Sequence, residues 1–472
     1  MDMINVKHRM FDVMNPGVAD NSVAEPLYRQ YDPDVEISEN NNNININVRD
    51  MSEYYNLSDS FLEVTLQYSK TGAVLVAGEQ THPCHMAGGV ASCFNTTRLR
   101  LNNVLVEDNQ YSLHNSFIKV LTTKSKQWID TVGRAQGIVL DTSEGNDPEK
   151  YTNIAATPFV KKGRAVFNEG LRERLKLVGE SALIQEEVKE EFEIRDPAGA
   201  KTQTYTLPLS DLFSFCSVNK VLKGAPVRIE LIKNDGLLNC FTKGTTAGGE
   251  VRVTKCVLWL KIVRPSLPVL AELETLYNSE AVIPWNYPKW TVYSSDATSS
   301  ADRRYTFSTL SEKPHTAFLF LSQPSDSALA NNLINHLQYS TCIDSASSAP
   351  SLRTARLKIN GRQFPYSEYD MTWTSGSRSV ARAYQELVKF ASRDENHVDG
   401  FAITPQTFRT NYPVLHFDLA EVEPSSGGYQ VQVELTNNQT AANRPVTIYL
   451  CVVSEGKVQI QLSNRNVLVY NK

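Results

Sequence analysis

The alternation of apolar and polar positions along the chain is typical of short, half-buried β-strands. It is clear at 44–48 and again at 61–68, where every second residue is apolar. A third alternating stretch enters a turn at 99–103, and a near copy of it occurs at 357–361. The second half of the chain therefore echoes the first.

The echo continues in the same order through the rest of each half. After the strand and turn come a tyrosine, a helical stretch, an Asp-Leu pair, an alternating strand and a last apolar strand. In the first half these are Tyr111, 112–130, 211–212, 227–231 and 256–263; in the second they are Tyr369, 378–390, 418–419, 431–435 and 446–453. Self-similarity of this length predicts a duplicated β-sandwich, an all-β fold with short helices.

A chain of 472 residues is long enough for two domains of about 200 residues each. We expect an extended N-terminal arm, because the beginning of the chain has proline, glycine and asparagine clusters without sustained periodicity. The linker is expected to hold a short helix, 269–277, after a proline-rich stop. The predicted division is an arm at 1–43, a first sandwich at 44–265, a linker at 266–280 and a second sandwich at 281–472.

The first half carries a long insertion, 137–200, that has no counterpart in the second half. We expect it to hold an irregular loop, a helical turn at 171–177 and an acidic segment at 186–193. Such insertions gather at the ends of a sandwich. The glycine-rich stretch 243–249 lies between two predicted strands, and we interpret it as a hairpin connection.

The helical stretch after Tyr111 is expected to present one apolar face. Its members are spaced roughly as one helix face requires, and they are Leu113, Phe117, Leu121 and Trp128.

Composition and charge exclude several classes of protein. Hydrophobic residues make up 41% and charged residues 21%, which is typical of a compact fold, and the net charge is −5. That charge balance lacks the basic footprint of a nucleic-acid binder. We interpret two local basic clusters, 119–126 and 161–164, as a solvated helix face and a loop, and expect no sequence-specific nucleic-acid binding.

The start of the chain lacks the apolar core of a signal peptide, and no uncharged apolar run approaches ~20 residues. We therefore expect neither secretion by that route nor a membrane-spanning segment. The cysteines are odd in number and widely spread, so we interpret them as buried free thiols of a reducing compartment. The seven are Cys84, Cys93, Cys216, Cys240, Cys256, Cys342 and Cys451.

Two motifs that would best indicate a hydrolase or a nucleotide-binding protein are missing from the sequence. It has no Gly-x-Ser-x-Gly elbow and no phosphate-binding Gly-x-x-x-x-Gly-Lys-Ser/Thr loop. The one tight group of potential metal ligands is His82, Cys84 and His85, in which adjacent positions aim poorly at a single ion. We interpret it as a polar loop, keep a metal-dependent enzyme as an open alternative, and expect no catalytic residue, metal site or cofactor.

An aromatic cluster follows the linker, formed by Trp285, Tyr287 and Trp290. Buried rings of this kind pack domain junctions, whereas exposed ones bind sugars or receptors. We expect packing between the domains. A two-domain carbohydrate- or receptor-binding β-sandwich remains the alternative function.

Two similar domains in tandem form a pseudo-dimer, so three copies could close a ring with six similar faces. In its motifs the chain also resembles a known family, the double jelly-roll major capsid proteins of the Polinton (Maverick) and adintovirus type. That family is related to virophage major capsid proteins and, more distantly, to adenovirus hexon. The resembling segments, in order, are 11–16, 54–60, 207–213, 224–231, 357–365, 384–387 and 412–419.

The resemblance implies two tandem eight-stranded jelly rolls and no enzyme activity. It implies homotrimers that form pseudo-hexagonal capsomers of an icosahedral shell around a double-stranded DNA genome. The expected partners are neighbouring capsomers and minor capsid proteins of the penton or cement kind. The expected location is the virion capsid, assembled in the cytoplasm or nucleus of a host cell.

Overall fold

The structure is a computed structural model, and most of the predicted strand and helix segments fall within the part that it describes. The described residues are 23–38, 41–49, 52–70, 84–85, 87–142, 170, 181–186, 189–194, 201–234, 241–242, 249–279, 281–296, 302–310, 312–322, 352–371, 379–391, 400–437, 447–463 and 466–471.

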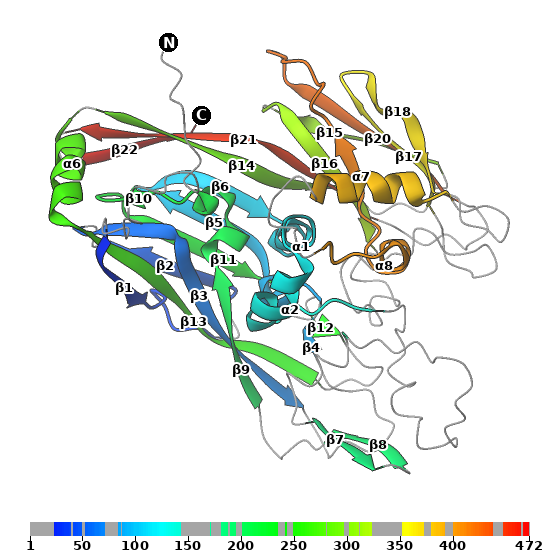
Figure 1. The fold of residues 1–472 in the computed structure, drawn as a ribbon, viewed down its shortest axis with the longest axis horizontal. Helices are drawn as coiled ribbons and strands as arrows, with labels where there is room; N and C mark the ends of the chain where they lie inside the picture. The colour runs from blue at the N-terminus through cyan, green and yellow to red at the C-terminus, as the bar shows by residue number, and fades with distance from the viewer. Residues whose placement is uncertain are drawn as a thin grey trace, which may run out of the picture.

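The first half folds into two facing antiparallel sheets (Figure 1). The first, which we call the β1 sheet, has the order β1 (Val23–Tyr31), β13 (Gly249–Pro265) and β3 (Tyr54–Lys70). Beyond β3 lie β9 (Lys201–Pro208) and β10 (Val221–Leu222), which both pair with β3. The second, the β2 sheet, has the order β2 (Asn43–Val48), β11 (Val227–Lys233), β5 (Phe94–Leu101) and β6 (Val104–Gln110).

The second half repeats this arrangement. Its β14 sheet has the order β14 (Val282–Ser294), β21 (Thr447–Ser463), β16 (Pro314–Ser322) and β19 (Leu415–Asp418), with β22 (Asn466–Asn471) paired to β21. Its β15 sheet has the order β15 (Asp302–Leu310), β20 (Tyr429–Asn437), β17 (Leu352–Ile359) and β18 (Arg362–Asp370).

Strand order and connectivity are those of a jelly roll in both halves. The chain crosses from sheet to sheet after most strands, and in each half a hairpin joins two neighbours of the four-stranded sheet, β5–β6 and β17–β18. The fold is therefore a double jelly roll, as predicted. The repeat that the sequence shows at 99–103 and 357–361 is this hairpin in its two copies.

Both hairpins turn through two residues with left-handed backbone. Asn102 and Asn103 have φ of 47° and 65°, and Asn360 and Gly361 have φ of 49° and 84°. Positive φ at both central residues matches the right-handed twist of the flanking strands, and asparagine and glycine adopt it at least cost. The turn residues thus set the register of each hairpin.

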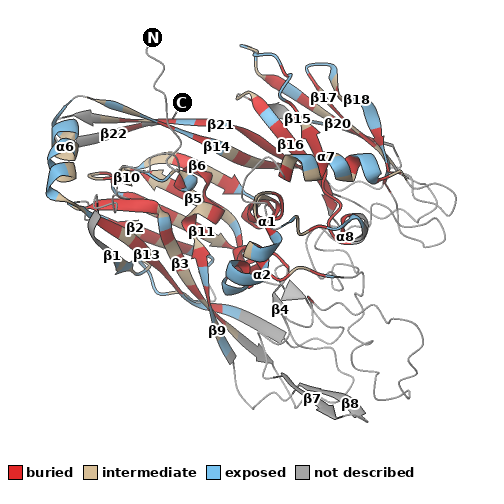
Figure 2. Cartoon of the chain, in the orientation of Figure 1, coloured by how far each residue is buried: buried red, intermediate tan, exposed pale blue. Residues whose placement is uncertain are grey.

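The alternation in sequence becomes burial on one face of each strand. In β11 every second residue from Val227 is buried, and β2 and β5 alternate in the same way. Figure 2 shows the buried residues gathered between the facing sheets. The sandwich interiors are therefore the two main hydrophobic cores.

Helices and short strands occupy the connections. The helices are α1 (Ser112–Thr123), α2 (Lys126–Ala135), α5 (Leu209–Leu212), α6 (Leu267–Asn278), α7 (Ala381–Ala391) and α8 (Pro405–Thr410), with 3-10 turns η2 (Gly89–Cys93) and η4 (Ser214–Ser217). Two small ribbons pair β4 (Cys84–His85) with β12 (Phe241–Thr242) and β7 (Ser181–Glu186) with β8 (Lys189–Ile194). The linker helix α6 lies where a helix was predicted, and it has no buried residue.

Four predictions need correction. Part of the predicted arm is strand β1, which pairs with β13 over Val23 to Tyr31, because the backbone N–H and C=O groups of β13 offer it hydrogen-bonding partners. Strand β3 begins at Tyr54 instead of near residue 61. The predicted hairpin connection at 243–249 is wrong, because β11 and β13 belong to different sheets and the strand just before it, β12, pairs with β4. Residues 243–248 themselves lie outside the described residues.

The fourth correction concerns the helical stretch after Tyr111. It is two helices, because Ser125 has extended backbone and its side chain caps α2 by accepting a hydrogen bond from the backbone N–H of Trp128. Leu113, Phe117 and Leu121 are buried in α1, but so are most other residues of this helix, which therefore has no single buried face; Trp128 belongs to α2.

The acidic segment of the insertion, for which no conformation was predicted, falls largely in β8, which pairs with β7. The predicted helical turn at 171–177 lies outside the described residues.

Candidate assembly surfaces

Helix α1 of the first sandwich packs on the β14 sheet of the second. The ring of His114 stacks on Tyr449 at 4.3 Å and lies 5.6 Å from Phe320, measured between ring centroids. The side-chain amide of Asn115 donates to the backbone carbonyl of Trp290 at 3.0 Å. One sandwich therefore covers a sheet of the other.

The face that α1 covers is the outer one, directed away from the β15 sheet. Tyr293 contacts Phe307 of β15, with ring centroids 6.3 Å apart, so Tyr293 points into the sandwich. Leu450 pairs with Tyr293, and its neighbour Tyr449 must point to the opposite side because side chains alternate along a strand. Tyr449 and its partner Phe320 thus lie on the outer face.

A second contact runs the other way, from the strands of the second half to the core of the first. Strands β14, β21 and β22 extend beyond their own sandwich across the first one (Figure 1). Trp285 stacks on Phe215 at 4.9 Å, and the Tyr287 hydroxyl donates to the carbonyl of Val106 at 3.3 Å. Burial raises the pKa of Tyr287 well above its ordinary range, and the nearby Glu107 adds to the effect.

The predicted aromatic cluster therefore packs the domain junction. Trp285, Tyr287 and Trp290 are at most 3% exposed. Trp290 belongs to the second core, where it stacks on Phe318 at 5.4 Å. Because these rings are buried, a sugar cannot stack on them. The carbohydrate-binding alternative therefore has no support from the residues on which it was based.

Two buried carboxylates are satisfied beside this junction. Glu107 accepts hydrogen bonds from the backbone N–H groups of Ser214 and Phe215, at 3.0 and 2.9 Å. Asp211 accepts from the side-chain amide of Gln136 at 2.9 Å, and the Lys124 ammonium lies 3.6 Å from it. Such partners are what a buried carboxylate requires, so these groups hold the turn around η4 and α5 in place.

The basic cluster at 119–126 is not wholly the solvated helix face that was predicted. The Lys119 ammonium donates to the carbonyl of Ser210 at 2.5 Å, and burial lowers the pKa of Lys119, against the attraction of Asp211 and Glu107. Lys124 lies 4.8 Å from the Trp128 ring centroid. Lys126, by contrast, is exposed and pairs with Asp130. The second cluster, 161–164, lies outside the described residues.

The outer faces of the β2 and β15 sheets repeat a charged cluster. On β11, Glu230 accepts a hydrogen bond from Arg100 at 3.2 Å and forms ion pairs with Arg228 at 2.9 Å and with Arg98 at 3.9 Å. At the matching position of β20, Glu434 forms ion pairs with Lys358 at 2.9 Å, with Arg304 at 3.0 Å and with Arg356. Each cluster has one central carboxylate and three basic groups.

Sequence reasoning aligned the two glutamate-bearing strands but missed these clusters. The available signal was the alternation of basic residues on the paired strands, Arg98 with Arg100 and Arg356 with Lys358, at positions that face outward. Burial acts to raise the pKa of Glu434, but hydrogen bonds from Lys358 and Arg356 outweigh it and hold that pKa below its usual value.

The outer face of the β1 sheet carries an aromatic cluster. Ring centroids of Tyr28 and Phe61 are 5.7 Å apart, and those of Phe61 and Trp259 are 6.5 Å apart. Phe61 pairs with Trp259 in the ladder between β3 and β13, and Tyr28 is 47% exposed. We call these three residues the outer aromatic cluster.

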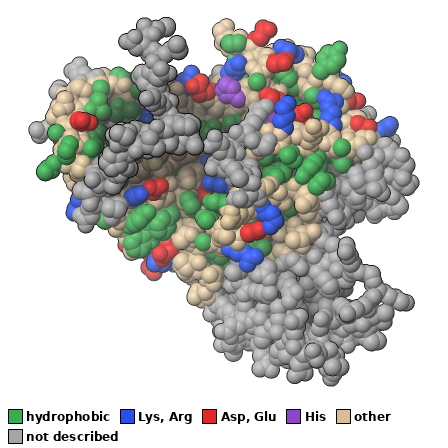
Figure 3. All heavy atoms as spheres, viewed as in Figure 1, with side chains coloured by type: hydrophobic (Ala, Val, Ile, Leu, Met, Phe, Trp, Pro, Cys, Tyr) green, Lys and Arg blue, Asp and Glu red, His purple; other side chains and the backbone are tan. Residues whose placement is uncertain are grey.

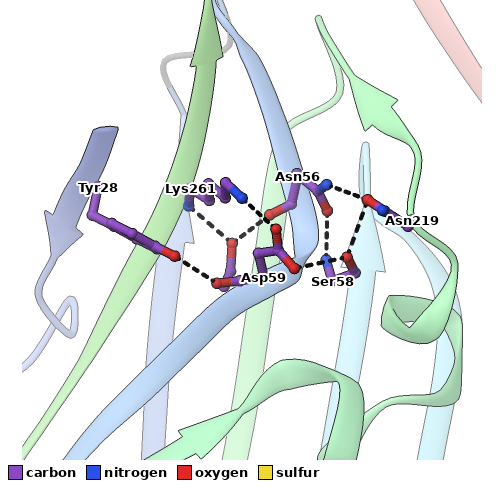
Figure 4. Close-up of polar contacts among 7 residues, drawn as sticks. Tyr28, Asn56, Ser58, Asp59, Asn219 and Lys261 are labelled. Atoms are coloured by element: carbon purple, nitrogen blue, oxygen red, sulfur yellow. Dashed lines mark hydrogen bonds and ion pairs between the residues drawn. The ribbon is translucent and has the colours of Figure 1, made fainter. Parts of the chain in front are cut away.

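Polar groups edge this cluster where β3 bulges (Figure 4). The Tyr28 hydroxyl donates to the Asp59 carbonyl at 3.4 Å, and the Asp59 carboxylate pairs with Lys261. The side-chain amide of Asn56 donates to that of Asn219 at 2.6 Å. Figure 3 shows hydrophobic side chains interspersed with acidic and basic ones on the viewed side of the first sandwich.

The candidate metal ligands are only partly described. Cys84 and His85 form β4, which pairs with β12, and His82 lies outside the described residues. Within the described ranges, no three His, Cys, Asp or Glu side chains group closely enough to hold a metal ion.

Four of the seven cysteines can be assessed, and all four are buried free thiols as predicted. They are Cys93, Cys216, Cys256 and Cys451. Burial raises the pKa of Cys256 to about 12. Among the helices that the structure describes, none has the length and apolar character needed to cross a membrane.

Comparison with known proteins supports the fold. No protein-family model matches the sequence. No curated protein sequence matches it either. Among solved structures, a chain of the Sputnik virophage is similar, with a TM-score of 0.55 and 13% identity over 100% of this chain and 93% of that one. The Faustovirus major capsid protein gives a TM-score of 0.53 and 13% identity over 95% and 93% of the two chains. At this identity the likeness establishes a shared fold.

Proposed function

We propose that this chain is a major capsid protein of the Polinton and adintovirus type. The observation that carries the proposal is the pairing of two jelly rolls of equal topology in one chain, in which a helix of the first covers a sheet of the second. The likeness in fold to the Faustovirus major capsid protein supports it.

In this proposal the chain acts by assembly and not by catalysis. Three copies form a homotrimer in which six similar sandwiches make a pseudo-hexagonal capsomer. Capsomers then tile an icosahedral shell around a double-stranded DNA genome. Neighbouring capsomers and minor capsid proteins of the penton or cement kind are the partners, and the shell assembles in the cytoplasm or nucleus of the host cell.

The proposal is tested by the mass and shape of the purified protein. Light scattering should give three times the chain mass of 52.8 kDa. Negative-stain images should show six-sided particles. A monomer that persists across a wide range of protein concentrations would contradict the proposal, as would particles without six-sided outlines.

A further inference from the structure

The two sandwiches of the chain differ in how their outer sheet faces are covered. On the β14 sheet the outer rings Phe320 and Tyr449 are at least partly enclosed by His114 and Tyr111 of the first sandwich. On the β1 sheet the outer aromatic cluster still presents Tyr28 to solvent with 47% of its surface exposed. The same face of a repeated fold is thus covered in one copy and open in the other.

The covering helix has a counterpart in the second sandwich. Helix α1 follows the hairpin β5–β6, and α7 follows the equivalent hairpin β17–β18. Helix α7 packs beside β19 of its own sandwich through Phe390, whose ring lies 4.9 Å from His416. Its side chains Gln385 and Lys389 are exposed, and so is Arg382, whose guanidinium lies 5.5 Å from the ring centroid of Tyr369 in the same sandwich. The second sandwich therefore presents a helix where the first presents α1.

We propose that a second copy of this chain covers the outer aromatic cluster with the α7 side of its second sandwich. This inference rests on the proposed trimer, in which three-fold symmetry repeats one contact between neighbouring chains. The likeness of the two sandwiches makes the contact within the chain the pattern for the contact between chains. Within the chain, helix α1 packs on the outer face of the β14 sheet. In the equivalent contact between chains, helix α7 of one copy packs on the outer face of the β1 sheet of the next copy.

The composition of the open face suits a protein contact. Tyrosine and tryptophan are enriched at the centres of interfaces, and a polar rim surrounds them. Here the rim consists of ion pairs: Glu63 with Lys255 at 2.5 Å, Glu53 with Arg29 at 2.8 Å, and Asp59 with Lys261. Trp259 is oriented by a hydrogen bond from its indole N–H to the Glu63 carboxylate, at 3.1 Å. The aromatic centre is therefore held in one arrangement before any partner binds.

The test compares the mass of the full-length protein with that of three variants by light scattering over a dilution series. The variants are the double substitution Tyr28→Ser with Phe61→Ser, the single substitution Tyr28→Arg, and Val35→Ser as the control. Val35 is 62% exposed in the connection between β1 and β2, away from the cluster. Circular dichroism checks that each variant is folded.

We expect the double variant and Tyr28→Arg to need at least a tenfold higher concentration than the wild type for half-trimerisation, whereas Val35→Ser trimerises like the wild type. If the double variant does not fold, the test rests on Tyr28→Arg alone. This substitution should leave the fold intact, because the side chain of Tyr28 lies at an exposed edge. A wild-type trimer with unchanged trimerisation of both cluster variants overturns this inference and leaves the proposed function standing. That result is also expected if residues 1–22 of the same chain, or another protein, cover the face. A wild type that stays monomeric overturns both proposals.

Discussion

At the scale of single residues, the side chains that matter most are those that join parts of the chain distant in sequence. Trp285 stacks on Phe215, 70 positions earlier, and its indole N–H lies 3.4 Å from the carbonyl oxygen of the same residue. Glu434 of β20 forms ion pairs with basic side chains of β15 and β17. One side chain is aromatic and the other is charged, but each contacts residues that lie far from it in the sequence.

Replacement of Trp285 by alanine should destabilise the protein by about 3–5 kcal/mol, because a large ring that is 1% exposed would leave a cavity. Urea unfolding followed by far-UV circular dichroism measures the shift in midpoint. Tyr366→Ala is the matched control, since Tyr366 is 99% exposed and its removal should change stability by less than about 0.5 kcal/mol. Equal shifts in the two variants would contradict the assigned role of Trp285.

The charge of Glu434 should stabilise the fold in a pH-dependent way. Its folded pKa lies below the unfolded value of about 4.3, so its contribution is present above that pH and is lost as the pH falls through the folded pKa. Glu434→Gln should cost about 1–3 kcal/mol at pH 7, and the difference from wild type should shrink below about pH 4.

Urea titrations at a series of pH values measure this effect. The control is Glu421→Gln, which removes the carboxylate that pairs with Arg362 at 2.7 Å where both side chains are more than half exposed. Its cost should be less than about 0.5 kcal/mol at every pH. A constant cost for Glu434→Gln from pH 3 to pH 7 would show that its charge is not what matters.

At the scale of elements, the repeated hairpins show the same backbone solution reached with different residues. The turn of the first hairpin is Asn102-Asn103 and that of the second is Asn360-Gly361, all four with positive φ. Because each hairpin sets the register of its sheet, its turn residues act on a whole ladder of strand pairs.

Gly361→Ala should therefore destabilise the second sandwich by about 1–2 kcal/mol. An added Cβ at Gly361 meets no atom within 4 Å, so the cost comes from its φ of 84° alone. Asn103→Gly tests the equivalent position in the first hairpin and should change stability by less than about 0.5 kcal/mol. Thermal denaturation of both variants at one protein concentration measures the two effects, and a harmless Gly361→Ala would mean that the turn relaxes.

At the scale of the whole molecule, the two sandwiches share their cores. Phe117 and Ile118 of α1 belong to the core of the second sandwich, while Trp285 and Val458 of the second half belong to the core of the first. Neither half can lose its structure without exposing apolar surface of the other. The linker helix α6 has no buried residue, but its Tyr277 packs against the core of the first sandwich.

The chain should consequently unfold in one cooperative transition. Differential scanning calorimetry at fixed protein concentration should give a single peak, and Trp285→Ala should move that whole peak to lower temperature. Two separated peaks, with only one moved by the substitution, would show that the halves unfold independently.

Much of this architecture is determined by the sequence alone, because alternation and turn chemistry are local properties. The strands at 44–48 and 227–231, and the turns at 102–103 and 360–361, follow from which neighbours are apolar and which residues tolerate positive φ. Local pattern cannot say which strand pairs with which. The tertiary structure alone decided that 23–31 is an edge strand, that β11 and β13 lie in opposite sheets, and that α1 covers the β14 sheet. These facts depend on contacts between residues far apart in the chain, whose free energy comes from burial that no single segment encodes.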